Sequence, residues 1–225
     1  MFGTYFYNKN IRNIVILFGT IFNDISIRRV TAAGVTQNQF KVPIGYGPAQ
    51  KYLTKLKQKQ LDEQTGITLP RMSFEITTMV YDTTRKLQTT KKIRQVNDSD
   101  NTKLKTIYTP VPYNFEIDLS IMVKNSDDGS QILEQILPYF TPEFHVTMNE
   151  MTTLGIKRDI PVVLTALTTQ DEYEGDFLTR RALIHTLSFT VQGYIYGPTK
   201  DQGIIREADV NTGFNFNDEK EVNID

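Results

Sequence analysis

Strict alternation of apolar and polar residues marks the clearest elements of this chain. Residues 72–80, 113–123 and 183–191 each carry apolar side chains at every second position, with Thr78 and His185 as the two exceptions. Because successive side chains of a strand point to opposite faces, this period predicts long antiparallel strands with one buried face. Residues 40–46 alternate in the same way. They contain Pro43, which has no N–H for a ladder and therefore predicts an edge position or a bulge.

Three further segments favour strands. Residues 26–31 and 144–151 are short candidates, and residues 160–167 are apolar on both faces. A strand that is apolar on both faces is typical of the interior of a sheet, so the last segment is predicted to lie centrally.

Helical spacing appears in three places. Residues 10–22 have apolar side chains at i, i+3, i+4 and i+7, with Asn8 or Asn10 as a candidate cap. Residues 49–60 follow Pro48 and predict a short basic helix. Residues 126–137 begin with two acids that complement a helix dipole. The chain is therefore predicted to be α+β, a mostly antiparallel or mixed β-sheet flanked by two to three helices.

Two polar segments stand apart from this pattern. Residues 83–105 hold seven basic and two acidic residues, a net charge of +5, around a turn cluster at residues 97–101. This pattern predicts a long projecting hairpin. Two interpretations of the hairpin stay open, a solvated loop and an arm that contacts a partner. Residues 198–225 hold three basic and seven acidic residues, a net charge of −4. We therefore divide the chain into a domain, residues 1–198, and an acidic peripheral tail, residues 199–225.

Composition narrows the classes of function. Lys and Arg number 25 against 26 Asp and Glu, a balance that argues against a DNA-coating protein. The chain has no cysteine, which excludes disulfides and thiolate sites and suits a reducing compartment. Residues 11–22 are too short and too polar to span a bilayer, and the N-terminus lacks the pattern of a signal peptide. No membrane association is predicted.

Motifs that carry catalysis or bind cofactors are not found. Residues 45–51 form a glycine-containing turn without the Gly-Lys-Ser/Thr ending of a phosphate loop. The acids between Asp171 and Asp176 do not have calcium-loop spacing. His185 lies on the apolar face of its strand and is interpreted as a core or interface histidine, with a catalytic base as the alternative. We predict no enzyme activity, no catalytic residue, no cofactor and no metal site.

Four blocks of sequence carry a resemblance to a known family. They are residues 1–8, 131–148, 157–164 and 178–194, in that order and at similar spacing across residues 1–198. The chain resembles the tail sheath stabiliser and completion proteins, of the tail-terminator type, of contractile-tailed bacteriophages. The acidic tail matches poorly.

The resemblance implies a structural virion protein with a tail-terminator-like fold, assembled in the host cytoplasm as a homo-hexameric ring. Such a ring ends the tail tube at its head-proximal end, stabilises the extended sheath and joins the tail to the neck. The implied partners are further copies of the chain, the tail sheath protein, the tail tube or tube-terminator protein, and a neck or head-completion protein. Genomic DNA would pass through the lumen without specific binding, and no cofactor is implied.

A closed ring needs two different surfaces that meet between neighbours, and exposed strands or arms are one way to supply them. The basic hairpin and the N-terminal aromatic residues are the main candidates. The residues predicted to lie at interfaces are Phe2, Tyr5, Phe6, Tyr7, Arg85, Lys91, Lys92, Arg94, Arg180 and Arg181. The lumen is predicted to lack a strong basic patch, since tight phosphate binding would retard DNA passage.

Two other functions fit the residues. One is a different neck or baseplate component of the virion. The other is a nucleic-acid-binding module that uses the basic hairpin, and it predicts DNA binding that weakens steeply with salt.

Overall fold

The computed structural model describes residues 5–30, 36–58, 68–97, 100–151, 154–173 and 180–203. The helices are α1 (Asn10–Ile21), α2 (Ala49–Gln58), α3 (Ser126–Ile136) and the 3₁₀ turn η1 (Leu137–Tyr139). The strands are β1 (Ser26–Val30), β2 (Thr36–Lys41), β3 (Ile44–Tyr46), β4 (Arg71–Tyr81), β5 (Lys92–Asn97), β6 (Asp100–Tyr108), β7 (Val111–Val123), β8 (Glu143–Met151), β9 (Ile156–Tyr173), β10 (Arg180–Ile195) and β11 (Lys200–Gly203).

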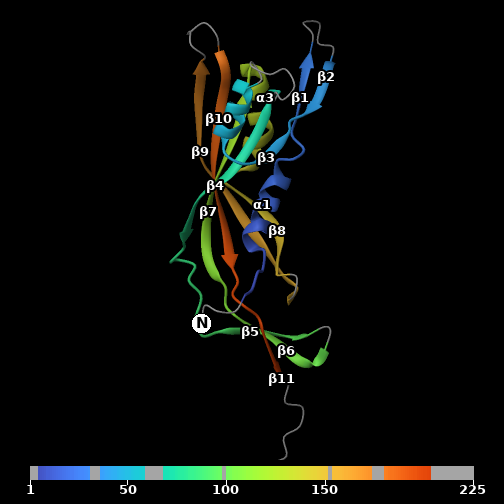
Figure 1. Ribbon diagram of the computed structural model, residues 1–225, viewed down its shortest axis with the longest axis vertical. Helices are drawn as coiled ribbons and strands as arrows, with labels where there is room; N and C mark the ends of the chain where they lie inside the picture. The colour runs from blue at the N-terminus through green and yellow to red at the C-terminus, as the bar shows by residue number, and fades with distance from the viewer. Residues whose placement is uncertain are drawn as a thin grey trace, which may run out of the picture.

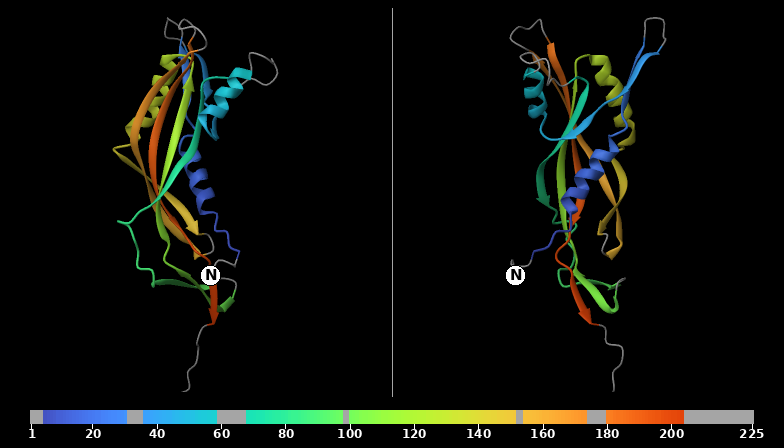
Figure 2. Two further views of the ribbon diagram at one scale, coloured as in Figure 1. Left: turned by 60° about the vertical axis from the view of Figure 1, so that its left-hand side comes forward. Right: turned by 45° about the vertical axis from the view of Figure 1, so that its right-hand side comes forward.

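The strands of the described residues form three sheets. The main sheet has the order β3-β4-β7-β10-β9-β8, in which only β3 and β4 pair in parallel, with α2 between them in the chain. The β1–β2 hairpin is a separate sheet, and a small sheet has the order β11-β6-β5. The molecule is elongated, with the β1–β2 hairpin near one end and the small sheet beyond the other end of the main sheet (Figures 1 and 2). The predicted α+β class is confirmed.

An aromatic cluster forms the centre of the main core. Phe189 of β10 lies with its ring centroid 5.3 Å from that of Phe18 and 5.5 Å from that of Phe22 at the end of α1. Phe140, just after η1, completes the cluster at 5.1 Å from Phe189. The predicted strands β7 and β10 are confirmed. Alternating side chains of each strand, including Phe115 of β7 and Phe189 of β10, are buried in this core.

The predicted helix at residues 10–22 is confirmed as α1, but its capping is different. The N-cap is Lys9, with φ 58°, and it makes no side-chain cap. The Asn8 amide instead donates to the carbonyls of Tyr196 and Gly197 at 3.0 and 2.8 Å, and that of Asn10 donates to the carbonyl of Tyr194 at 3.3 Å. The two asparagines therefore tie the start of α1 to the end of β10.

Helix α1 approaches β10 closely at Gly193. A Cβ atom at that position would lie 2.8 Å from both Ile14 Cδ1 and Phe115 Cε2. We expect Gly193→Ala to destabilise the chain by about 1–3 kcal/mol, because the overpacked contact must push α1 away from the sheet. Chemical denaturation measures this loss, with Gly203→Ala as the control, since nothing lies within 4 Å of its added Cβ. Equal stabilities of the two variants would contradict this packing.

Two strand predictions need correction. Residues 40–46 are not one strand, because the chain passes from β2 to β3 at Val42 and Pro43. The predicted edge position holds for β3, which is the edge of the main sheet. Strand β9 lies inside the sheet, but it pairs with β8 over its first half and with β10 over its second. Leu167 is accordingly 41% exposed, so the second apolar face of this segment is not fully covered.

Helix α3 begins where predicted, with Asp127 and Asp128 in its first turn. Asp128 is buried and accepts from the Arg29 guanidinium at 2.9 Å, which joins the helix to β1. The basic helix after Pro48 is α2, and the last two residues predicted for it, 59 and 60, lie outside the described residues.

Candidate interaction surface

The basic segment predicted as a projecting hairpin is part of the small sheet. Its two strands are β5 and β6, which pair from Lys92 and Tyr108 to Asn97 and Asp100. Strand β11 pairs with the other edge of β6, so the first residues assigned to the acidic tail belong to this sheet. The rest of that tail, residues 204–225, lies outside the described residues.

A second hydrophobic core fixes the small sheet to the main one. Ile107 of β6 is buried against Tyr196, Met151 and Leu154, which follow or end strands of the main sheet. Ile93 of β5 packs against the same cluster. The hairpin is therefore docked through its inner face, which leaves its outer face and the edge of β5 available for partners.

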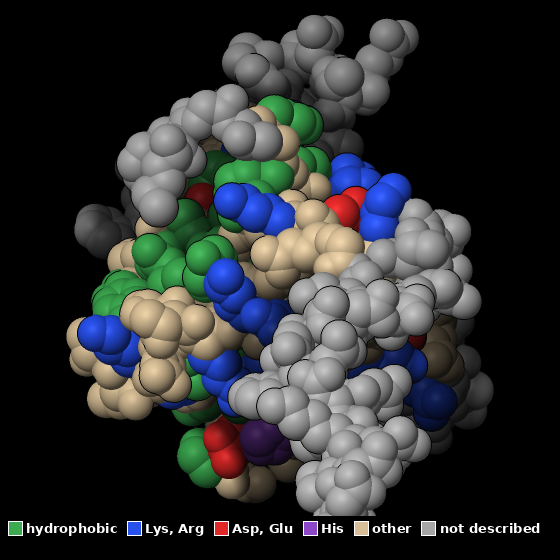
Figure 3. Space-filling view, turned by 90° about the horizontal axis from the view of Figure 1, so that it is seen from below, with side chains coloured by type: hydrophobic (Ala, Val, Ile, Leu, Met, Phe, Trp, Pro, Cys, Tyr) green, Lys and Arg blue, Asp and Glu red, His purple; other side chains and the backbone are tan. Residues whose placement is uncertain are grey.

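The outer face of the small sheet is basic and partly aromatic. Because Ile93 and Ile107 face inward, the alternate positions Lys92, Arg94 and Tyr108 face outward, and all three are exposed. The Lys92 ammonium lies 5.1 Å from the centroid of the Tyr108 ring. From this end of the molecule, Lys and Arg side chains lie among hydrophobic ones (Figure 3). Lys91, which precedes β5, is also exposed.

The N-terminal aromatic residues approach the same end. The bonds of Asn8 to Tyr196 and Gly197 place the preceding residues beside the connection to β11 (Figure 1). Tyr5 is 90% exposed, and Phe6 and Tyr7 are exposed as well. Phe2 lies outside the described residues. The structure thus brings Tyr5, Phe6 and Tyr7 to the end that carries Lys91, Lys92 and Arg94.

A buried carboxylate lies at the junction of the two sheets. Glu150 at the end of β8 accepts from the Tyr196 hydroxyl at 2.6 Å and from Nε of Arg158 at 3.2 Å. Burial raises the pKa of Glu150, while the bonds from Tyr196 and Arg158 oppose that rise. Burial and the bond to Glu150 also raise the pKa of the Tyr196 hydroxyl. This network connects the second core to strand β9.

Arg85 was predicted to contact a partner, but its guanidinium is occupied within the chain. It donates to the Asp82 carboxylate at 2.7 Å and to Oδ1 of Asn114 at 2.6 Å, and it lies over the Tyr194 ring. Bonds from the Thr84 hydroxyl and from Arg85 lower the pKa of Asp82. Arg85 is half-buried in the segment before β5, at the junction between the sheets, and its contact with a partner stays a prediction.

Arg180 and Arg181 lie far from the other candidates. They start β10, whose first residues are at the end of the main sheet opposite the small sheet (Figure 1). Their side chains are outside the described residues. The predicted set is therefore divided between two ends of the molecule.

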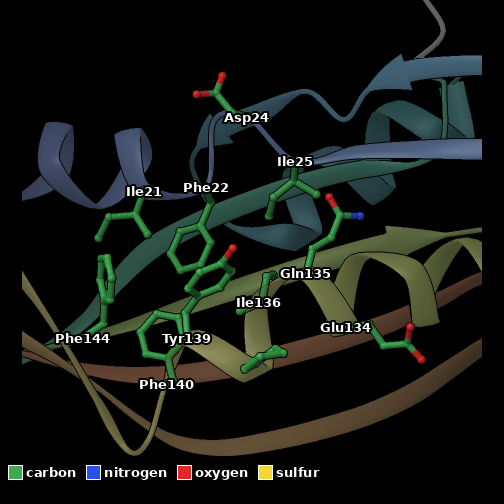
Figure 4. Close-up of a pocket in the computed structure, with 11 residues that line it drawn as sticks. Ile21, Phe22, Asp24, Ile25, Glu134, Gln135, Ile136, Tyr139, Phe140 and Phe144 are labelled. Carbon is green, nitrogen blue, oxygen red and sulfur yellow. The ribbon is translucent and has the colours of Figure 1, made fainter.

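An apolar groove that the sequence pattern did not predict opens between α1 and α3 (Figure 4). Its volume is about 510 Å³. Phe22, Ile136 and Phe140 form its buried floor, and the 67% exposed ring of Tyr139 forms part of its wall. The groove had no periodic signal, because it is created by the meeting of two helix ends that are distant in sequence.

His185 belongs to the core beneath α3. Its Nδ1 lies 2.9 Å from the Thr169 hydroxyl, and its Nε2 packs near Gly129. Burial lowers its pKa, and the Asp171 carboxylate opposes that change. This environment fits the interpretation as a core histidine.

Among the described residues, no group of three or more His, Cys, Asp or Glu residues is arranged to hold a metal ion. None of the described helices is long and apolar enough to cross a bilayer.

Comparison with known proteins shows the family of the chain. The family described as "T4-like virus Myoviridae tail sheath stabiliser" matches residues 5–225, so the match includes the acidic tail that the sequence blocks left out. The chain is also 34% identical over 215 residues to the "Tail completion protein gp15" of Enterobacteria phage T4. That alignment covers 92% of this chain and 77% of the T4 protein. The chain therefore belongs to the tail sheath stabiliser family of T4-like myoviruses.

Proposed function

We propose that the chain forms a ring, a hexamer of identical subunits, at the head-proximal end of a contractile phage tail. The family match across residues 5–225 carries this proposal. As a tail sheath stabiliser the protein is a component of the virion tail. The ring would end the tail tube, hold the sheath extended through contacts with the sheath protein, and offer a surface to a neck or head-completion protein.

The shape of the subunit supports a ring. Closed rings use heterologous contacts, in which two different surfaces of each subunit meet. The small sheet and the β1–β2 hairpin give the subunit two unlike ends (Figure 2). In addition, β5 and β11 are both edges of the small sheet, and an edge strand can pair with a strand of a neighbour.

The protein acts in this proposal by contact alone, without a bond made or broken. The support is chemical: His185 is enclosed by core residues, and Glu150 is held by Tyr196 and Arg158. Neither group lines the apolar groove. Residues 1–198 remain the proposed structural domain, and residues 199–225 a tail that begins with β11.

Electron microscopy of virions that carry a labelled copy tests the position. We expect a ring of label at the end of the tail nearest the head, and native mass measurement of that ring gives its stoichiometry. Label in the baseplate or on the head side of the neck would instead favour another neck or baseplate component. Label elsewhere in the virion would overturn both.

The outer face of the small sheet provides a separate test of partner contact. We expect the double change Lys92→Glu and Arg94→Glu to lower binding of the protein to tails by at least about tenfold, because like charges replace complementary ones at a contact. Lys51→Glu on the exposed side of α2 is the matched control. Binding is measured by sedimentation with purified tails, and unchanged binding would remove this face from the interface.

The same double variant also tests the alternative that the protein is a nucleic-acid-binding module. A DNA-binding module would retain duplex DNA with an affinity that falls steeply with salt, and the double change would abolish it. We expect no such salt-dependent retention, since the charged face is small and the chain is nearly neutral. Salt-sensitive DNA binding that depends on Lys92 and Arg94 would favour the alternative.

A further inference from the structure

The apolar groove between α1 and α3 has no role in the sheets or in the Glu150 network. Its floor is apolar, and Ile21 and Phe144 extend it along α1 and β8. A groove of about 510 Å³ lies within the usual size of pockets that bury a small ligand, roughly 300–1,000 Å³. Apolar surface of this kind, bordered by polar groups, is typical of an interaction site.

An exposed aromatic segment of the same chain matches the apolar character of this groove. Residues 5–8, which we call the N-terminal arm, present Tyr5, Phe6 and Tyr7 to solvent. Aromatic side chains provide large contact area with few rotatable bonds, and they are the usual anchors of protein interfaces. Aromatic rings of the arm can therefore pack against aromatic rings of the groove, among them Phe22, Tyr139 and Phe140.

Charge favours the arm over the other end of the chain. Asp24 and Glu134 stand on opposite sides of the groove (Figure 4). Lys41 neutralises Asp24 at 2.9 Å, and Glu134 makes no ion pair with the described residues. The first ten residues contain Lys9 and no acid, whereas residues 204–225 contain two basic and six acidic residues. The acidic tail would meet like charge at this rim.

The arm of one chain is directed away from its own groove. It leaves the start of α1, where Asn8 is bonded to Tyr196 and Gly197, while the groove lies at the other end of that helix beside Phe22. A helix of 12 residues separates the two points by about 18 Å. A neighbouring subunit can supply the arm without breaking the bonds of Asn8.

We infer that the N-terminal arm of each subunit occupies the apolar groove of the next copy in the ring. This inference rests on the proposed function. The contact of arm with groove joins two different surfaces, and such a heterologous contact, repeated from subunit to subunit, is satisfied in every copy when the ring closes. Tyr5, Phe6 and Tyr7 pack over Phe22, Phe140 and Tyr139 in this arrangement. Lys9 then lies toward the acidic rim.

The absence of cysteine allows a direct test by crosslinking. Thr4→Cys places a thiol next to the arm without removing an aromatic residue, and Pro138→Cys places one at the groove. The two single variants carry different tags, are mixed, assembled on tails and treated with a short bis-maleimide. We expect a covalent dimer that contains both tags as the main product, and little of it when Lys51→Cys replaces the groove variant.

A second measurement removes the anchors. The triple change Tyr5→Ser, Phe6→Ser and Tyr7→Ser is expected to weaken subunit association by on the order of 30-fold, as loss of interface anchors does. Its unfolding midpoint should stay close to that of the unchanged chain, since the three side chains are exposed. Unchanged association would overturn the inference.

Each other crosslinking result has a defined meaning. Rings that form on tails without the dimer would overturn the arm contact and leave the proposed function intact. Crosslinks from the groove to a cysteine at Asn215→Cys in the tail, to the sheath protein, or within one doubly substituted chain would also overturn it. A chain that forms no ring on tails would overturn the proposed function, and this inference with it.

Discussion

Replacing Phe189 by alanine is expected to destabilise the chain by about 3–5 kcal/mol, the largest effect of any single truncation we predict. The ring of Phe189 is buried and contacts Phe18, Phe22 and Phe140, which come from α1, the turn after it, and the turn after η1. Its loss leaves a cavity where both helices meet the main sheet. Urea unfolding followed by fluorescence or circular dichroism measures the change.

An exposed aromatic residue provides the control that shows whether burial causes the loss of stability. Tyr5→Ala removes a ring of similar size from a 90% exposed position, and we expect it to change stability by no more than about 0.5 kcal/mol. Because Phe22 and Phe140 also form the floor of the groove, Phe189→Ala should in addition weaken ring formation. A loss below about 1 kcal/mol would mean that the aromatic cluster does not hold α1 and α3 on the sheet.

Periodicity was a reliable guide where one face of an element is buried. Strands β7 and β10 and helix α1 follow the predicted positions, because alternation or helical spacing directly records which side chains enter the core. In β4 the alternation holds for Met72 and Phe74 but not beyond the bulge after Ile76, where Val80 is 48% exposed. Periodicity failed at Pro43, where a missing N–H divides one alternating run between two sheets. Pairing partners were not predictable, since β11 joins β6 across about 100 residues with no local signal.

The candidate surface was predictable only in part. Exposed aromatic and basic residues such as Tyr5 and Lys92 were found because they interrupt the core pattern. The contacts of Arg85 with Asn114 and Tyr194 were not predictable, because the sequence does not show that these residues lie beside it, and its place at an interface stays a prediction. Glu150 was missed for a related reason: acids are assumed to be exposed unless a partner is visible, and Arg158 becomes its neighbour only through the β8–β9 pairing.

Replacing Arg158 by methionine is expected to destabilise the chain by about 2–3 kcal/mol at neutral pH. The change keeps much of the apolar stem but removes the cation from the Glu150 carboxylate, whose side chain is 1% exposed. Breaking a fully buried pair costs about 3–5 kcal/mol. The smaller figure applies here because the Arg158 side chain is 35% exposed and is screened by solvent.

The loss should depend on pH in one direction. Burial already raises the pKa of Glu150 above its ordinary value of 4.5, and removing Arg158 raises it further. A carboxyl whose pKa is raised by folding stabilises the native state below pH 4.5, and this stabilisation is lost as pH rises through the native pKa. The variant should therefore approach the stability of the unchanged chain in acid and fall behind it as pH increases.

Thermal unfolding from pH 4 to pH 8 measures this trend, and two control variants identify its cause. Glu150→Gln in the Arg158→Met background removes the titrating group, so the additional pH dependence should disappear. Lys41→Met breaks the exposed pair with Asp24 and should cost less than about 1 kcal/mol at every pH. If Arg158→Met lost the same stability at pH 4 as at pH 8, the cation would act by packing over Tyr194, which it contacts at 4.1 Å, and the charge of Glu150 would be irrelevant. The junction that holds the small sheet would then depend on shape alone.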